Sequence, residues 1–157
     1  MQHKPQYYYS QSAVIPYFRK NGRPVVMLIS TRKKQKWTLP KGIIEPGHSP
    51  AGSAAKEAFE EAGIRGQIRD QRFDYFEYYK WGGICTVDVF LMEVSEVLDQ
   101  WPEKDERQRT LVDPCQAPDL IGREAIKPVL EHFCREQDRW SGRPTARANC
   151  SSRRSAG

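Results

Sequence analysis

A short alanine-rich segment from Pro50 to Ala62 combines a helix signal with an uneven distribution of charge. Ser49 before a proline is typical of a helix start, and Gly63 stands where a C-terminal cap belongs. At about 100° per residue the alanines fall on one stripe and three glutamates on the opposite side. The three glutamates are Glu57, Glu60 and Glu61. This stretch constrains the fold strongly, because one face must be buried while the other is acidic.

The acidic face has two interpretations. Carboxylates three and four residues apart repel each other by a few tenths of a kcal/mol per pair, so a cation over the face would stabilise the helix. Mg²⁺ suits this role, since it binds a few carboxylates together with substrate phosphates. The alternative is an ordinary solvated face, which is common on helices. The helix alone leaves both open.

The rest of the chain alternates between strand and turn signals. We expect strands at 12–18, 24–30, 37–39, 67–79, 83–94 and 106–112, and a helical region at 118–140 that Gly122 and Pro128 should divide. Asn21-Gly22 predicts a hairpin turn, and Pro16 suggests an edge strand or a bulge. Residues 41–47 should form a loop. The order of elements indicates an α/β domain.

Length and composition bound the remaining possibilities. The 157 residues suit one domain at 1–140, followed by a basic tail at 141–157 that we expect to be disordered. No apolar run is long enough to span a bilayer and the start lacks a secretory signal, so we expect a soluble cytoplasmic protein without a membrane partner. The four cysteines should then be reduced thiols, and their spacing argues against a structural zinc site.

Charge is distributed asymmetrically along the chain. Residues 1–44 contain nine Lys or Arg and no acid, whereas residues 45–140 contain all 20 acids and twelve bases. A basic region beside clustered carboxylates suits a polyphosphate bridged by metal ions, although a solvated face or a nucleic-acid patch is also compatible.

The acidic helix lies inside a longer pattern that resembles the Nudix box. That pattern is Gly, five residues, Glu, seven residues, Arg-Glu, an apolar residue, any residue, Glu-Glu, any residue, Gly, and an apolar residue. Seven of its nine specified positions match in register: Gly42, Glu57, Ala58, Glu60, Glu61, Gly63 and Ile64. His48 stands where the pattern has its first Glu, and Lys56 where it has Arg. With the order of the strands included, the resemblance covers about residues 8 to 138.

The resemblance implies a Nudix-like α/β/α sandwich with a mixed, largely antiparallel sheet and a loop-helix catalytic motif. It implies Mg²⁺, or possibly Mn²⁺, held by Glu57, Glu60 and Glu61 and by the backbone carbonyl of Gly42. Glu57 and Glu60 would form the catalytic set, with Glu60 as a ligand or as the base that deprotonates water. Some members use a glutamate outside the box, so Glu103 or Glu106 stays an alternative base.

The two departures from the box raise a separate question. In the family the first Glu and the Arg can pair as opposite charges, whereas here His48 and Lys56 would meet. A neutral imidazole could accept a hydrogen bond from Lys56, or Glu45 could supply the missing charge. A metal-ligand role for His48 is less favoured, because Mg²⁺ prefers oxygen.

The resemblance implies a Nudix-type pyrophosphohydrolase, a hydrolase acting on acid anhydrides. The basic run before the box resembles the branch that cleaves diadenosine polyphosphates and diphosphoinositol polyphosphates, and it makes Arg32, Lys33 and Lys41 candidate substrate-binding residues. Nucleotide sugars, ADP-ribose, damaged nucleotides and RNA 5′ ends remain alternatives. A rival of another class is a non-catalytic Nudix-like module that binds nucleotide or RNA. The partner is expected to be a phosphorylated small molecule, with nucleic acid less favoured, and the oligomeric state is open.

Overall fold

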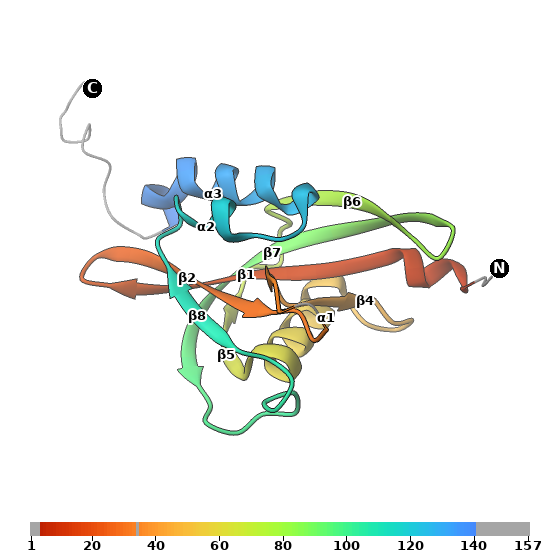
Figure 1. Ribbon diagram of the computed structural model, residues 1–157, viewed down its shortest axis with the longest axis horizontal. Helices are drawn as coiled ribbons and strands as arrows, with labels where there is room; N and C mark the ends of the chain where they lie inside the picture. Colours follow the sequence, from red (N-terminus) through yellow and green to blue (C-terminus); the bar gives the residue numbers. More distant parts are fainter. Residues whose placement is uncertain (1–3, 34, 141–157) are drawn as a thin grey trace.

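The chain forms three layers, with a mixed sheet between helices on its two faces. The computed structural model describes residues 4–33 and 35–140, so the tail expected at 141–157 lies outside the described residues. In Figure 1, α3 and α2 lie on one side of the sheet and α1 lies on the other. The expected α/β/α sandwich is confirmed. No helix within the described ranges is long and apolar enough to cross a bilayer.

The elements follow one another in the expected order. The strands are β1 (Ser10–Lys20), β2 (Arg23–Ser30), β3 (Trp37–Thr38), β4 (Lys41–Ile43), β5 (Ile64–Ile68), β6 (Asp74–Lys80), β7 (Gly83–Val97) and β8 (Arg109–Val112). The helices are α1 (Pro50–Glu57), its π-helical continuation η2 (Ala58–Ala62), α2 (Ala117–Leu120) and α3 (Lys127–Trp140). Two 3-10 turns, η1 (Gln6–Tyr9) and η3 (Glu124–Ile126), complete the set.

Strand β1 is the centre of the sheet. The main path runs β3-β2-β1-β7-β5, and β1 pairs parallel with β7 and antiparallel with β2 and β4. The expectation that Pro16 marks an edge is therefore wrong. Pro16 lies between the part of β1 that pairs with β4 and the part that pairs with β2, so its missing N–H interrupts neither ladder. The central position of β1 brings β4, and with it the start of the Nudix-like box, against the sheet.

Alternation along the strands divides the core in two. Ala13, Ile15 and Tyr17 pack with buried residues of α3, whereas Val14 packs with the alanines of α1. This pattern is that of a strand covered on both faces. The alanine stripe of the acidic helix is buried as expected, with Ala54, Ala58 and Ala62 fully inaccessible. The opposite, acidic face is thereby directed away from the sheet.

Three boundaries differ from the expectation. Residues 41–43 form a strand, not a loop, because β1 extends far enough to pair with them. The segment expected as one strand at 67–79 is two strands, β5 and β6, which both pair with β7. Pro128 does not divide the last helix, since it occupies the first turn, where its missing N–H costs nothing.

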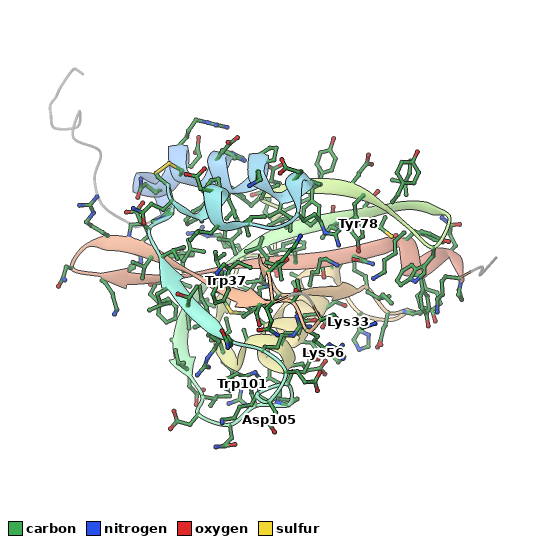
Figure 2. The ribbon with its side chains drawn as sticks, viewed as in Figure 1. Lys33, Trp37, Lys56, Tyr78, Trp101 and Asp105 are labelled. Atoms are coloured by element: carbon green, nitrogen blue, oxygen red, sulfur yellow. A yellow bond between two sulfur atoms is a disulfide. The ribbon has the colours of Figure 1, made fainter. Side chains whose placement is uncertain are left out.

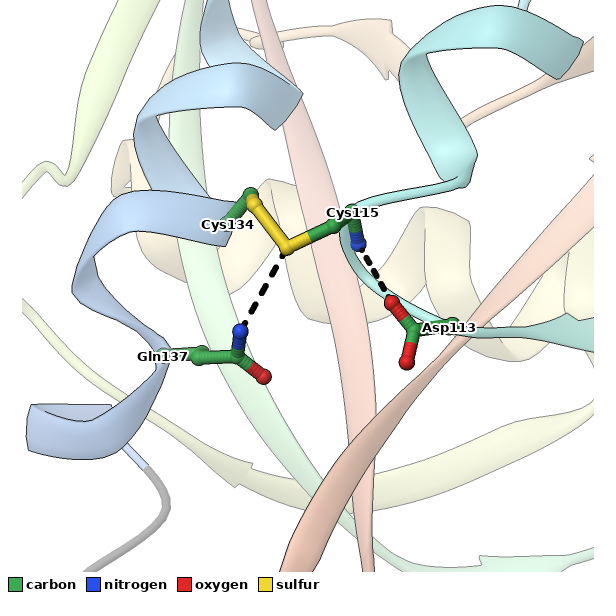
Figure 3. Close-up of a disulfide and its surroundings, with 4 residues drawn as sticks. All are labelled: Asp113, Cys115, Cys134 and Gln137. Carbon is green, nitrogen blue, oxygen red and sulfur yellow. Dashed lines mark hydrogen bonds between the residues drawn. A yellow bond between two sulfur atoms is a disulfide. The ribbon is translucent and has the colours of Figure 1, made fainter.

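The expectation of four reduced thiols is also wrong, because Cys115 and Cys134 form a disulfide (Figure 3). The Asp113 carboxylate accepts a 2.8 Å hydrogen bond from the Cys115 backbone N–H and turns the chain toward α3. This turn leaves the two cysteine Cα atoms 4.9 Å apart. The expectation of reduced thiols followed from the expected redox compartment. The disulfide depends on a turn that the spacing of the cysteines does not reveal. Cys85 is buried and free.

We expect reduction of this disulfide to lower the free energy of unfolding by about 3 kcal/mol, because a closed loop of this length restricts the unfolded chain by about that amount. Urea unfolding with and without dithiothreitol measures the change. The Cys115→Ser, Cys134→Ser double variant should match the reduced protein and be insensitive to reductant. Equal unfolding midpoints in both conditions would show that the bridge adds no stability.

Candidate active site

A polar cleft of about 1010 Å³ opens beside the acidic helix. Its walls come from the segment between β2 and β4, the end of α1 with η2, the β6–β7 turn, and the segments before β8 and α3. The cleft is lined by basic residues and carboxylates, together with apolar side chains such as Trp37 and Trp81. The charged lining residues are Arg32, Lys33, Lys36, Lys41, Glu45, Lys56, Glu57, Glu60, Glu61, Lys80, Glu103, Arg107 and Arg123. In Figure 2, Lys33, Trp37 and Lys56 mark this cleft.

The helix that carries the glutamates is capped at both ends as expected. The Ser49 side chain accepts a 2.9 Å hydrogen bond from the Gly52 N–H, and Gly63 ends the helix in the left-handed region at φ 66°. The last five helical residues form a π-helical turn, a feature often found at functional sites. Two of the four metal-ligand candidates, Glu60 and Glu61, lie in this turn.

Glu57 and Glu61 lie together at the floor of the cleft. The Glu61 side chain is 8% exposed and accepts a 3.1 Å hydrogen bond from the Lys41 backbone N–H. The Glu57 carboxylate lies so close to Gly42 that a Cβ there would overlap it. Burial raises the pKa of both carboxyl groups, that of Glu61 to about 8. The charge of Glu57 raises the pKa of Glu61 further, whereas a hydrogen bond with Glu61 lowers that of Glu57. A partly buried acid beside a buried one therefore favours a cation or a shared proton.

Arg107 partly compensates this charge. Its Nε donates to Glu103 at 2.8 Å, and its Nη2 lies 3.5 Å from the Glu61 carboxylate. The pKa of Glu61 is raised despite the neighbouring guanidinium, because burial outweighs the attraction. One guanidinium thus faces the two acids Glu61 and Glu103, while Glu57 lies beside Glu61, which leaves room for further positive charge.

Glu60 is directed differently. It is half-buried and forms an ion pair with Lys56 at 3.2 Å, one helical turn earlier. His48 is half exposed and faces Glu45 at 3.9 Å. The two departures from the box therefore have separate partners: Lys56 pairs with Glu60 in place of a hydrogen bond to His48 or an ion pair with Glu45. His48 does not line the cleft.

The residues fit a divalent cation in chemistry, although they are not gathered around one point. At the cleft floor, the carboxylates of Glu57 and Glu61 supply oxygen ligands of the kind that Mg²⁺ prefers. Among residues 4–33 and 35–140, no three His, Cys, Asp or Glu side chains are close enough to form an assembled metal site. Of the expected ligands, the structure brings together Glu57, Glu61 and Gly42, while Glu60 is held by Lys56. Their role as ligands stays a prediction.

The expected substrate-binding residues all line the cleft but differ in environment. Lys33 is exposed, and Arg32 reaches across the cleft to Glu106 at 3.2 Å and Glu103 at 3.8 Å. The Lys41 ammonium is largely buried and donates to the Tyr78 hydroxyl at 3.0 Å. Burial, together with Arg123 nearby, lowers the pKa of Lys41. Lys41 is thus the most constrained cation of the three.

Replacing Gly42 with Ala should disturb the floor of the cleft, since the new methyl group would displace the Glu57 carboxylate. We expect a loss in kcat of about tenfold or more with an intact fold, because small displacements of catalytic groups have effects of this size. Steady-state kinetics and circular dichroism measure the two properties. Wild-type kcat in a folded Gly42→Ala protein would show that this close approach is unimportant.

Comparison with known proteins agrees with this geometry. The model of the NUDIX domain matches residues 9–133. The chain belongs to the NUDIX domain family. It is 32% identical to Nudix hydrolase 13, mitochondrial, of Arabidopsis thaliana over 120 residues, which cover 70% of this chain and 59% of that protein. It is 32% identical over 87 residues to diphosphoinositol polyphosphate phosphohydrolase 2 of Rattus norvegicus, covering 55% of this chain and 47% of that protein.

A solved structure shares the NUDIX fold. The binary complex of the C. elegans Ap4A hydrolase superposes with a TM-score of 0.68 at 22% identity, over 79% of this chain and 93% of the other. At this identity the likeness concerns the fold alone. The chain also spans less than two thirds of the length of the plant Nudix hydrolases 12 and 13.

Two further residues that line the cleft of this NUDIX domain, Arg107 and Arg123, are not indicated by its sequence patterns. Arg107 carries no motif, and only its position four residues after Glu103 hints at a pair. Arg123, whose guanidinium stacks 4.1 Å from the centre of the Tyr78 ring, reaches the cleft from the segment before α3. These contacts join distant parts of the chain, which local spacing does not predict.

Proposed function

We propose that this NUDIX domain is a Mg²⁺-dependent pyrophosphohydrolase that cleaves a diphosphate linkage in a highly phosphorylated small molecule. The observation that carries the proposal is the pair of Glu57, which is partly buried, and Glu61, which is buried, at the floor of a basic cleft. A carboxylate pair of this kind has no evident structural purpose, because burial opposes its charge. The names of the related hydrolases support the same reaction class.

The proposed role of each residue follows from its position in the cleft. Glu57, Glu61 and the Gly42 carbonyl would hold the cation, with Glu60 joining them if it leaves Lys56. The bound cation would neutralise phosphate oxygens and lower the pKa of a water molecule. Glu60 or Glu103 would orient that water and accept its proton, since both carboxylates line the cleft. The lysines and arginines of the opposite wall would bind the remaining phosphates.

The favoured substrate class is a dinucleoside polyphosphate or a diphosphoinositol polyphosphate. Support comes from the number of cations around the cleft, which exceeds what one diphosphate needs. Arg32, Lys33 and Lys36 lie on one wall, and Lys80 and Arg123 come from two other segments. Each additional phosphate adds charge that these groups can bind, whereas a nucleotide sugar offers only two.

A phosphate-release screen with Mg²⁺ tests the proposal. The screen should include dinucleoside polyphosphates, diphosphoinositol polyphosphates, nucleotide sugars, ADP-ribose and nucleoside triphosphates. We expect the highest kcat/KM with one of the first two classes and none in EDTA. Binding without turnover of every substrate would favour a non-catalytic module instead.

The basic wall gives a quantitative test of substrate class. We expect Lys33→Ala to raise KM about threefold to tenfold for substrates with five or six phosphates and less for those with two, because only long chains reach this exposed ammonium. Lys20→Ala, in the hairpin between β1 and β2, is the matched control outside the cleft. An equal change in KM for short and long substrates would show that Lys33 is a solvated side chain that does not distinguish the length of the phosphate chain.

A further inference from the structure

The guanidinium of Arg107 connects three separate segments beneath the cleft. Its side chain is 9% exposed, and each nitrogen faces a different partner. Nε donates to the Glu103 carboxylate at 2.8 Å, Nη1 donates to the Ser30 carbonyl at 3.1 Å, and Nη2 lies 3.5 Å from the Glu61 carboxylate. Arg107 therefore joins the end of β2, the segment before β8 and the π-helical turn.

This arrangement uses the shape of the side chain as well as its charge. A guanidinium presents donors in a rigid planar fork, whereas a lysine ammonium is a compact charge on a flexible stem. Only the fork can satisfy a carbonyl and two carboxylates in three directions at once. A buried charge with this many partners is costly to misplace, so its geometry is fixed by its surroundings.

Glu103 is the partner that gains most from this contact. Its backbone N–H donates to the Glu60 carbonyl at 3.1 Å, so the chain around Glu103 is attached to the π-helical turn. The Trp101 indole N–H strengthens this attachment by donating to the Glu61 carbonyl at 3.2 Å. The backbone of Glu103 is therefore placed by the turn that carries Glu60 and Glu61, and its side chain is oriented by Arg107.

We propose that Arg107 is a positioning residue, which holds the Glu103 carboxylate at the edge of the Glu57 and Glu61 pair. The inference rests on the proposed hydrolase function and deepens it, because it assigns a role to a residue that lies outside the Nudix-like box. In this role Arg107 acts through Glu103. The bond of Arg107 to Ser30 fixes the far side of the guanidinium and makes the orientation unique.

Arg107→Lys and Arg107→Met separate charge from geometry. Outer partners of catalytic groups typically contribute 10- to 100-fold to activity. We expect Arg107→Met to lower kcat about 30-fold or more and Arg107→Lys to lower it about tenfold, with KM within threefold of wild type in both. The lysine variant retains the positive charge beside Glu61. Its decrease in kcat therefore measures the effect of losing the planar guanidinium.

Arg109→Met is the matched control. Arg109 follows two residues later and also anchors this part of the chain, because its guanidinium donates to the carbonyls of Ala62 and Leu98 and stacks on Trp101. It contacts no carboxylate of the cleft and does not line it. Arg109→Met should lower the unfolding temperature without changing kcat beyond threefold at temperatures where it is folded. An equal loss of kcat in both variants would reduce Arg107 to a structural anchor.

A double-mutant cycle decides whether Arg107 acts through Glu103. In a Glu103→Gln background, Arg107→Lys should lower kcat by less than twofold, because the carboxylate that it orients is already gone. Multiplicative losses in the double variant would overturn the proposal, as would wild-type kcat in a folded Arg107→Met protein.

Mn²⁺ binding, measured by calorimetry without substrate, keeps the test independent of turnover. Arg107→Lys should weaken Mn²⁺ binding about threefold, and this effect should vanish in the Glu103→Gln background. If the wild-type protein binds Mn²⁺ but hydrolyses nothing, the proposed function fails while this coupling still tests Arg107. An unchanged Mn²⁺ dissociation constant together with an unchanged kcat would refute the positioning role.

Discussion

Glu61→Gln should lower kcat by two to three orders of magnitude while leaving the fold intact. The amide keeps the size of the side chain and an oxygen that can accept from the Lys41 backbone N–H, but it removes the negative charge at the cleft floor. Loss of a metal ligand or of a base has effects on this scale. We expect Glu57→Gln and Glu60→Gln to fall in the same range. Steady-state kinetics with Mg²⁺ in excess, compared with EDTA, measure the change.

Glu96→Gln provides the control for this series. Glu96 also belongs to an ion pair, with Arg65 at 3.4 Å, but that pair is exposed on the neighbouring strands and lies outside the cleft. Exposed pairs of this kind contribute little to stability, so kcat and unfolding should both remain near wild type. Full activity of Glu61→Gln, or full wild-type activity in EDTA, would contradict the assignment of the acidic cluster as the catalytic centre.

The second large effect concerns stability as a function of pH. Because burial raises the pKa of Glu61 to about 8 from its ordinary value of 4.5, the folded state holds a proton that the unfolded state releases. The stabilisation is therefore complete below about pH 4.5 and is lost as the pH rises through 8. We expect the metal-free protein to lose up to about 5 kcal/mol of unfolding free energy across this window, because each unit of pKa difference corresponds to about 1.4 kcal/mol.

Urea unfolding in EDTA at pH 5, 7 and 9 measures this loss. Glu61→Gln should flatten the profile and be more stable than wild type at pH 9, since an amide never has to be ionised in the buried site. A decline of equal size in both proteins would assign the effect to other groups. The variant that removes activity is thus expected to stabilise the protein, a trade-off common at active sites.

The sequence predicted those parts of the fold that follow local periodicity and caps. The helix from Pro50 and the hairpin at Asn21-Gly22 follow from local spacing and turn residues. Pairing between segments that are distant in the chain was harder to predict from the sequence. Pro16 indicates an edge strand or a bulge, because the sequence does not show that two different strands, β2 and β4, share one side of β1.

The same distinction between local patterns and long-range contacts applies to the candidate site. The glutamates of the box and Gly42 were predicted, because their spacing along one helix and one loop is a local property. Arg107 and Arg123 were missed, since their contacts with Glu61 and Tyr78 arise only when distant segments meet. The ion pair of Glu60 with Lys56 was not predicted either, because spacing along the helix does not show which neighbouring side chain a glutamate contacts.

The position of β1 has a consequence for changing substrate preference. One strand supports β4 at its start, β2 at its end and β7 along its length, and the helix that carries the acidic floor packs on this strand through its alanines. The basic wall, by contrast, is carried by short connections, including Thr31 to Lys33 and the β6–β7 turn. Exchanging such connections between relatives should transfer selectivity for the length of the phosphate chain and leave the hydrolytic machinery in place.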